Sequence, residues 1–156
     1  MNKDELKEKI LKLSQGTMTP SESGVFDLMF DVKPSDLMKV ALMLRDHENL
    51  KFDFLNNISG VDTGERFEVV YSLSSITFSL RLDFKVALPY DQAVIESTKE
   101  VWPAAEWHER EIWELFGIDI ANHGDLNRFL LPDDWDQGYP MRKDWDAPDF
   151  IRMPQL

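Results

Sequence analysis

The feature that most constrains the fold is an alternation of apolar and polar residues between Ile76 and Val86. The apolar positions are Ile76, Phe78, Leu80, Leu82, Phe84 and Val86. Hydroxyl-bearing or charged residues occupy the positions between them. A period of two is typical of a β-strand with one buried face. A slip of one residue would expose six large side chains at about 2 kcal/mol each, so the register of this strand is fixed.

Three further segments have the composition of strands: residues 25–32, with Phe26, Leu28 and Phe30 on one face, and residues 51–58 and 66–73. Pro34 starts a helix between the first two, whose apolar stripe is Leu37, Val40, Ala41 and Leu44. Strand, helix and strand in this order predict a β-α-β unit with parallel strands and a right-handed crossover. Ser74 and Ser75 are expected to form the tight connection before the alternating strand.

A helix is predicted near each end of the chain. Residues 3–14 carry an apolar stripe, and Asn2 with Glu5 is placed for a capping box. Residues 14–24 should form a polar loop, and residues 89–98 a loop or short helix. A later helix ends at Gly117, and the spacing of Glu106, Arg110 and Glu114 favours ion pairs along it. Its predicted inward side chains are Ala105, Ile112, Leu115 and Phe116, widened by Trp107 and Trp113.

After Asp125 the large apolar residues follow no helical or strand period. They are Trp135, Tyr139, Met141, Trp145, Phe150, Ile151 and Met153, interrupted by Pro132, Pro140, Pro148 and Pro154. The sequence therefore predicts an α+β fold: a mixed four-stranded sheet with helices packed on one face, and an extended irregular C-terminal arm. The domain should span residues 1–124. The arm should span residues 125–156 and must lay these side chains on the surface of this domain or on another protein. Widely spaced aromatic anchors favour contact with partner subunits.

Composition excludes several function classes. The 156 residues include no cysteine, which excludes thiolate metal sites, cysteine-ligated iron–sulfur clusters and a catalytic thiol. The formal net charge of −12 argues against nucleic acid and against direct docking on anionic lipid. No apolar run has the length of a membrane span, and the charged N-terminus is unlike a signal peptide. We therefore expect a cytoplasmic protein without direct membrane insertion.

Three ordered blocks near the C-terminus carry a family resemblance. They read E-R-E-x-x-x-L-F-G-I from Glu109, L-x-R-x-L-L-P-D-D-W from Leu126 and G-x-P-x-R-K-D from Gly138. Together they resemble the signature of the 30-kDa subunit of proton-pumping NADH:quinone oxidoreductase, respiratory complex I. One departure is visible, because the family usually has Gly-His-Pro-Asp-Leu where residues 122–126 read Asn-His-Gly-Asp-Leu.

The resemblance implies a non-catalytic assembly subunit that carries no cofactor. Flavin and iron–sulfur clusters would belong to partner subunits. The implied hetero-oligomer includes the 49-kDa subunit and neighbouring iron–sulfur subunits of the quinone-reducing module. The implied location is peripheral, on the cytoplasmic side of the inner membrane. The candidate interface and signature residues are Glu109, Arg110, Glu111, Leu115, Phe116, Gly117, Arg128, Leu131, Pro132, Asp133, Asp134, Trp135, Tyr139, Pro140, Arg142, Lys143, Asp144 and Trp145.

Other chemistries are less well supported by the residues. The segment beginning His108-Glu109 resembles a zinc-protease helix, but Ile112 stands where the second histidine belongs. Asp133, Asp134 and Asp136 lack the glycine and glutamate of a calcium loop. No nucleotide-binding glycine loop and no nucleophile–base motif is present. We therefore expect no catalytic, cofactor-binding or metal-ligating residue.

Two alternatives stay open. The same fold could serve a membrane-bound nickel–iron hydrogenase or another complex I-like oxidoreductase. A stand-alone acidic hydrolase, using carboxylates as general acid and base, is the second alternative.

Overall fold

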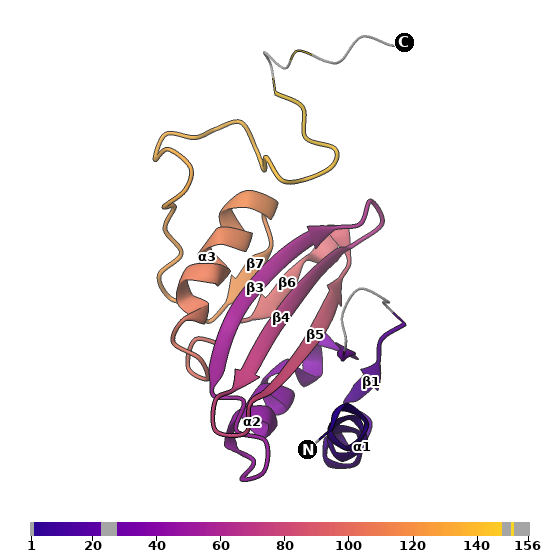
Figure 1. Ribbon diagram of the computed structural model, residues 1–156. Coiled ribbons are helices and arrows are strands. Elements are labelled where there is room, and N and C mark those ends of the chain that lie inside the picture. The colour runs from indigo at the N-terminus through magenta and orange to yellow at the C-terminus, as the bar shows by residue number, and fades with distance from the viewer. Residues whose placement is uncertain (1, 23–27, 148–150, 152–156) are drawn as a thin grey trace.

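The computed structural model describes residues 2–22, 28–147 and 151. Figure 1 shows a twisted sheet with α2 behind it, α1 beside β1, and the C-terminal segment running away beyond α3. The α-helices in this part of the chain are α1 (Lys3–Ser14), α2 (Leu37–Asp46) and α3 (Ala105–Phe116). The strands are β1 (Met18–Pro20), β2 (Met29–Val32), β3 (Phe54–Asp62), β4 (Phe67–Ser75), β5 (Leu80–Leu88), β6 (Val94–Glu96) and β7 (Asp119–Ala121).

The main sheet is mixed and has the strand order β1-β2-β5-β4-β3. β2 pairs with β5 in parallel, and the other neighbours are antiparallel. β2 and β3 therefore run in the same direction, as the β-α-β pattern predicts, but β5 and β4 lie between them. The predicted α+β class is confirmed. The sheet has a fifth strand because β1 pairs with β2 inside the segment predicted to be a polar loop. Its short run of Met18, Thr19 and Pro20 carries no alternation that would have indicated a strand.

Two 3-10 turns and a small second sheet complete the fold. The turn at Pro34–Asp36 leads into α2, and the turn at Tyr90–Gln92 precedes β6. β6 pairs in parallel with β7, and α3 lies between these two strands in the sequence. The predicted loop or short helix at residues 89–98 is thus a turn followed by a short strand, whose partner follows α3 and is invisible to local pattern.

The start of the alternating strand was predicted wrongly. β4 continues to Ser75, which pairs with Leu80, so the chain must reverse over residues 76–79. Ser79 takes a positive φ of 53° in this turn. Ile76 and Phe78 consequently lie at the hairpin tip with 68% and 42% of their surface exposed. The alternation from Leu80 to Val86 is confirmed, because every apolar position there is buried.

The inward face of the sheet and the helices α2 and α3 enclose one core. The α2 stripe of Leu37, Val40, Ala41 and Leu44 is fully buried, as predicted. Tyr71 and Phe84 stack in parallel across β4 and β5 with centroids 4.6 Å apart. Gly60 on β3 lets Phe116 of α3 approach so closely that a Cβ there would lie 2.7 Å from the ring. Aromatic burial of this kind supplies most of the stabilisation of a small domain.

The predictions for the first thirty residues are confirmed in part. The capping box of α1 is confirmed: Asn2 Oδ1 accepts from the Glu5 amide and Glu5 Oε2 from the Asn2 amide, both at 2.9 Å. Leu28 and Phe30 are buried as the strand pattern predicts. The predicted partner on that face, Phe26, lies outside the described residues.

Candidate functional site

The signature helix α3 buries charged side chains. Glu109, Arg110 and Glu114 are only 1%, 8% and 3% exposed. The predicted ion pairs of Arg110 with Glu106 and Glu114 are wrong, since among the described residues Arg110 instead donates Nε to the Asn127 carbonyl at 2.8 Å. Trp107, predicted to widen the inward stripe, is 55% exposed. Buried charges need full hydrogen bonding, and here the partners are backbone groups and hydroxyls of other segments.

Glu114 holds the beginning of the arm. Its carboxylate accepts the backbone N–H groups of Leu130 at 3.0 Å and Leu131 at 3.1 Å, and more distantly that of Phe129 at 3.5 Å. Several amides converging on one carboxylate form charge-assisted bonds, which are stronger than neutral ones. One buried side chain thus fixes the course of a segment that has no regular structure of its own.

Arg110 is held between two aromatic rings. Its guanidinium carbon lies 4.8 Å from the Trp107 ring centroid and 5.1 Å from that of Phe129. The two rings meet edge to face at 5.5 Å. Both remain partly exposed beside Leu130, which is 53% exposed. The result is a fixed apolar patch on the surface of the signature helix.

Glu109 performs a similar task on the other side of α3. It accepts hydrogen bonds from Ser97 Oγ at 2.6 Å and from the Thr98 amide and hydroxyl at 2.7 and 2.8 Å. Burial, and then the charge of Glu109, raise the pKa of the Tyr71 hydroxyl well above its ordinary value. Through these hydrogen bonds, the Glu109 carboxylate attaches Ser97 and Thr98, which follow β6, to α3.

His123 is buried where the arm leaves the domain. Its Nε2 lies 3.1 Å from the Glu106 carbonyl oxygen, and its Nδ1 accepts the Asp125 amide at 3.3 Å. Gly124 has a φ of +81°, whereas a proline is confined to about −65°. Where the family pattern has proline, this chain therefore makes a different turn.

A second attachment joins the arm to the end of α3. Gly117 caps the helix with a φ of +70°, and a Cβ there would meet the Tyr139 ring at 2.5 Å. Arg142 donates Nε to the Phe116 carbonyl at 2.6 Å, and its guanidinium covers the Tyr139 ring at 4.4 Å. The predicted C-cap glycine is confirmed, and its missing side chain leaves the space in which the arm lies.

A third attachment uses Asp62 at the end of β3. Its carboxylate accepts the Lys143 amide and the Gly64 amide, both at 2.8 Å, and a short hydrogen bond from the Tyr90 hydroxyl. Burial alone would raise the pKa of Asp62, but these hydrogen bonds outweigh it, so the pKa is lowered. The ionised carboxylate is the form that holds Lys143.

Beyond Leu131 the arm forms a loop that includes the second and third attachments and is closed by its own tryptophans. Trp135 Nε1 donates to the Gly138 carbonyl at 2.7 Å, and Trp145 Nε1 to the Gln137 carbonyl at 2.5 Å. Their rings lie 6.2 Å apart. From Gly124 to Ala147 every residue is described and none is buried. Phe150 and Met153, also predicted as anchors, lie outside the described residues.

The structure brings together most of the predicted signature residues, although with unequal roles. Phe116, Gly117, Tyr139, Arg142 and Lys143 meet at the second and third attachments. By contrast, the exposed side chains of Asp133, Asp134 and Asp144 take no part in these attachments.

Sequence reasoning missed Asp62, Tyr90 and Glu114 as site residues. Asp62-Thr63-Gly64 was available as an Asp-containing turn, and Glu114 stood inside the signature block. Tyr90 gave no signal.

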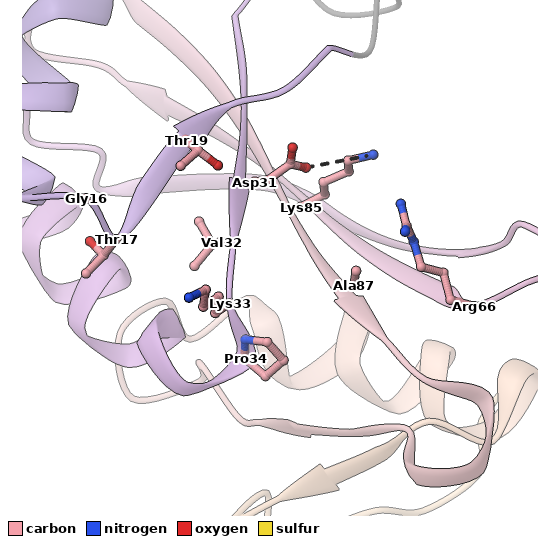
Figure 2. A pocket seen from close by; sticks show the side chains of 10 residues that line it. All are labelled: Gly16, Thr17, Thr19, Asp31, Val32, Lys33, Pro34, Arg66, Lys85 and Ala87. Carbon is pink, nitrogen blue, oxygen red and sulfur yellow. Dashed lines mark ion pairs between the residues drawn. The ribbon is translucent and has the colours of Figure 1, made fainter.

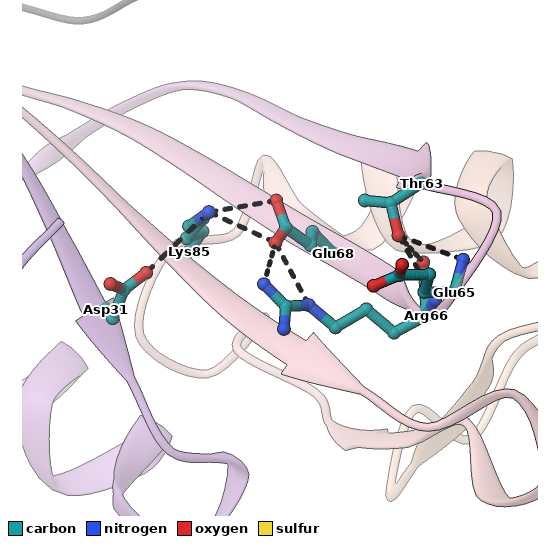
Figure 3. Close-up of polar contacts among 6 residues, drawn as sticks. All are labelled: Asp31, Thr63, Glu65, Arg66, Glu68 and Lys85. Carbon is teal, nitrogen blue, oxygen red and sulfur yellow. Dashed lines mark hydrogen bonds and ion pairs between the residues drawn. The ribbon is translucent and has the colours of Figure 1, made fainter. Parts of the chain in front are cut away.

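A polar cavity of about 390 Å³ lies on the outward face of the sheet (Figure 2). It lies between the segment after α1, which carries Thr17 and Thr19, and the ends of β2 and β5. Figure 3 shows three of its charged side chains in ion pairs: Lys85 lies 3.1 Å from the neighbouring Glu68 and 3.8 Å from Asp31, and Arg66 lies 2.8 Å from Glu68. Burial opposes ionisation of Glu68, but bonds from Arg66 and Lys85 lower its pKa. Pairing between neighbouring strands explains the contacts of Lys85, and Arg66 reaches Glu68 two residues along the same segment.

Two features are absent from the described residues. No helix among them is long and apolar enough to cross a membrane. No three His, Asp or Glu side chains among them are grouped as metal ligands would be.

Comparison with known proteins gives consistent matches. Residues 30–150 match the family described as respiratory-chain NADH dehydrogenase, 30 Kd subunit. The chain is 43% identical over 123 residues to an NADH-quinone oxidoreductase subunit of Acidothermus cellulolyticus, covering 76% of this chain and 64% of that one. It is 37% identical over 150 residues to the same subunit of Mycobacteroides abscessus, covering 91% and 65%. Across the relatives compared, it spans 49% to 69% of their length.

Two solved structures share the fold. A trypsin-resistant fragment of Nqo5 superposes with a TM-score of 0.64 at 25% identity, covering 77% of this chain and 98% of the fragment. A chain of the membrane-bound sulfane sulfur reductase, an archaeal respiratory membrane complex, superposes with a TM-score of 0.78 at 25% identity, covering 93% and 86%. The residues matched by the family include the three signature blocks and the attachments they form. The chain therefore belongs to the respiratory-chain NADH dehydrogenase 30-kDa subunit family.

Proposed function

We propose that this protein is a non-catalytic subunit of the peripheral arm of a proton-translocating NADH:quinone oxidoreductase. In this proposal it carries no cofactor and lies on the cytoplasmic side of the membrane. It supports the quinone-reducing module by contacting the 49-kDa subunit and the neighbouring iron–sulfur subunits. The names of the relatives support the parent complex, since all of them denote one and the same subunit of NADH-quinone oxidoreductases.

The observation that carries the proposal is the contrast between fixation and exposure in the arm. Glu114, Arg142 and Asp62 fix its backbone to the domain. Leu130, Tyr139 and Met141 nevertheless remain 53%, 41% and 54% exposed. Ordered, exposed large side chains are typical of protein interfaces. We therefore treat residues 125–156 as a docking arm and residues 1–124 as the domain that presents it.

Truncation after Leu131 tests the proposal. The shortened chain should keep its circular dichroism spectrum and unfold cooperatively, because no described residue after Leu131 belongs to the buried core. In cells that make the parent complex, it should be missing from that complex on native gels, and membrane NADH:quinone activity should fall with it. A full-length chain carrying the same tag is the control. Normal incorporation of the truncated chain would contradict the docking role.

A second parent complex is favoured by one observation: the higher structural similarity to a chain of the archaeal sulfane sulfur reductase. Gentle purification of the tagged full-length chain from membranes separates the two. An NADH-binding flavoprotein among the co-purified subunits identifies the NADH-dependent complex. A hydrogenase or sulfur-reductase subunit in its place identifies the alternative.

A further inference from the structure

We infer that residues 132–145 of the arm, here called the acidic loop, dock on a basic groove of a neighbouring protein subunit that has pockets for aromatic rings. This inference rests on the docking role proposed above and names the chemistry of the surface that the arm meets.

The first observation is the separation of charges in the arm. Residues 125–147 contain six aspartates and three basic residues. Two of the basic residues make hydrogen bonds within this chain. Arg142 donates to the Phe116 carbonyl, and Arg128 Nη1 donates to the Asp133 carbonyl at 3.2 Å. The third, Lys143, lies near Asp62 and helps to lower its pKa.

The aspartates beside Trp135 behave in the opposite way. Asp133, Asp134 and Asp136 are exposed, and their carboxylates make no hydrogen bond or ion pair with other described residues. They therefore contribute nothing visible to holding the arm on the domain. Three uncompensated carboxylates around one tryptophan present a strongly negative surface. A complementary partner must be positively charged.

The second observation is that the loop has a fixed shape without a partner. The indole N–H groups of Trp135 and Trp145 close it on the Gly138 and Gln137 carbonyls. Turn hydrogen bonds follow at Trp135 to Pro132 (3.0 Å) and at Trp145 to Arg142 (3.2 Å). A preorganised loop loses less conformational entropy on binding than a disordered segment does. It suits a preformed groove.

These two observations favour protein over membrane. Anionic lipid attracts basic segments and would repel a surface of uncompensated aspartates. Partly exposed tryptophan, tyrosine and methionine side chains beside the charges are typical of the centre of a protein interface. The occupant we assign is therefore a groove lined by arginine and lysine on another subunit of the same complex.

The test is charge reversal in the full-length chain. The variant Asp133→Lys, Asp134→Lys, Asp136→Lys should be incorporated into the membrane complex at about one tenth of the normal level or less. The matched control is Glu8→Lys, Asp53→Lys, Glu100→Lys, which makes the same charge change at exposed positions outside the arm. It should be incorporated normally. Both isolated variants should unfold at the same urea concentration as the parent chain.

Different outcomes separate this inference from the docking role. If truncation after Leu131 abolishes incorporation but the reversed loop is incorporated normally, the basic groove is wrong and the docking role stands. If the truncated chain is incorporated normally, the docking role itself fails. If the parent chain dimerises and reversal breaks only the dimer, with complex content unchanged, the loop binds a second copy and the inference is overturned.

Discussion

Aromatic side chains in the sheet and in the arm lie in opposite surroundings. Phe67, Tyr71 and Phe84 of the sheet are fully buried, whereas Phe129 and Tyr139 of the arm are 39% and 41% exposed. The sheet residues stabilise the domain by leaving water. The exposed arm rings do not provide this stabilisation. The backbone of the arm is nevertheless held by buried carboxylates and an arginine. The difference supports the proposal that the sheet stabilises the domain and that the arm contacts a partner.

The largest loss in the free energy of unfolding is expected when a core ring is replaced. Phe84→Ala should lower the free energy of unfolding by about 3–5 kcal/mol, because it leaves a cavity opposite Tyr71. Trp135→Ala should change it by at most about 1 kcal/mol, since only a half-exposed loop is affected. Urea denaturation of the isolated chain measures both. Equal costs for the two variants would remove the distinction between sheet and arm.

Removing the carboxylate that holds the arm should have an intermediate and local effect. Glu114→Ala deprives the amides of Leu130 and Leu131 of their acceptor, a loss of about 1–3 kcal/mol. Hydrogen exchange at these two amides should accelerate about ten-fold or more, while the sheet amides stay protected. Glu111→Ala, on the same helix and without a hydrogen bond to the described part of the arm, is the control. Similar acceleration in both variants would show that Glu114 is not the attachment.

Acid should release the third attachment. The pKa of Asp62 is lower in the folded chain than in the unfolded one, so its ionised form stabilises the folded state fully above the unfolded value of about 3.9. That stabilisation is lost as the pH falls below this value through the folded pKa. Exchange at the Lys143 amide, corrected for its intrinsic pH dependence, should rise in this range. In Asp62→Asn it should be fast at every pH, and Asp53→Asn should behave as the parent chain.

The smallest effect is expected at the hairpin tip. Ile76→Ser and Phe78→Ser should each change the free energy of unfolding by no more than about 0.5 kcal/mol, because these side chains are exposed. Leu82→Ala, further along the same alternation, is the buried comparison and should cost about 2–5 kcal/mol. Thermal or urea unfolding distinguishes them. A large loss at Ile76 would place the start of the strand where the alternation alone predicts it.

Local pattern predicted the elements whose residues share one periodic environment. The α2 stripe, the capping box at Asn2 and the C-cap at Gly117 are of this kind. Pattern failed where a distant partner decides the structure. β1 and β6 are too short to show a period, and each is a strand because another segment pairs with it. Ile76 fitted the alternation, but the pairing of Ser75 with Leu80 placed it in the turn.

The sequence by itself determined the class of the fold, the buried faces of the helices and the presence of an arm without regular structure. These depend on side-chain periodicity and on proline, both of which act over a few residues. Only the tertiary structure decided what the signature charges do. Glu114 and Arg110 are spaced for an ion pair, yet each binds backbone groups of the arm. Desolvation explains this result, because a buried charge goes to the groups that can satisfy it fully, wherever they lie in the sequence.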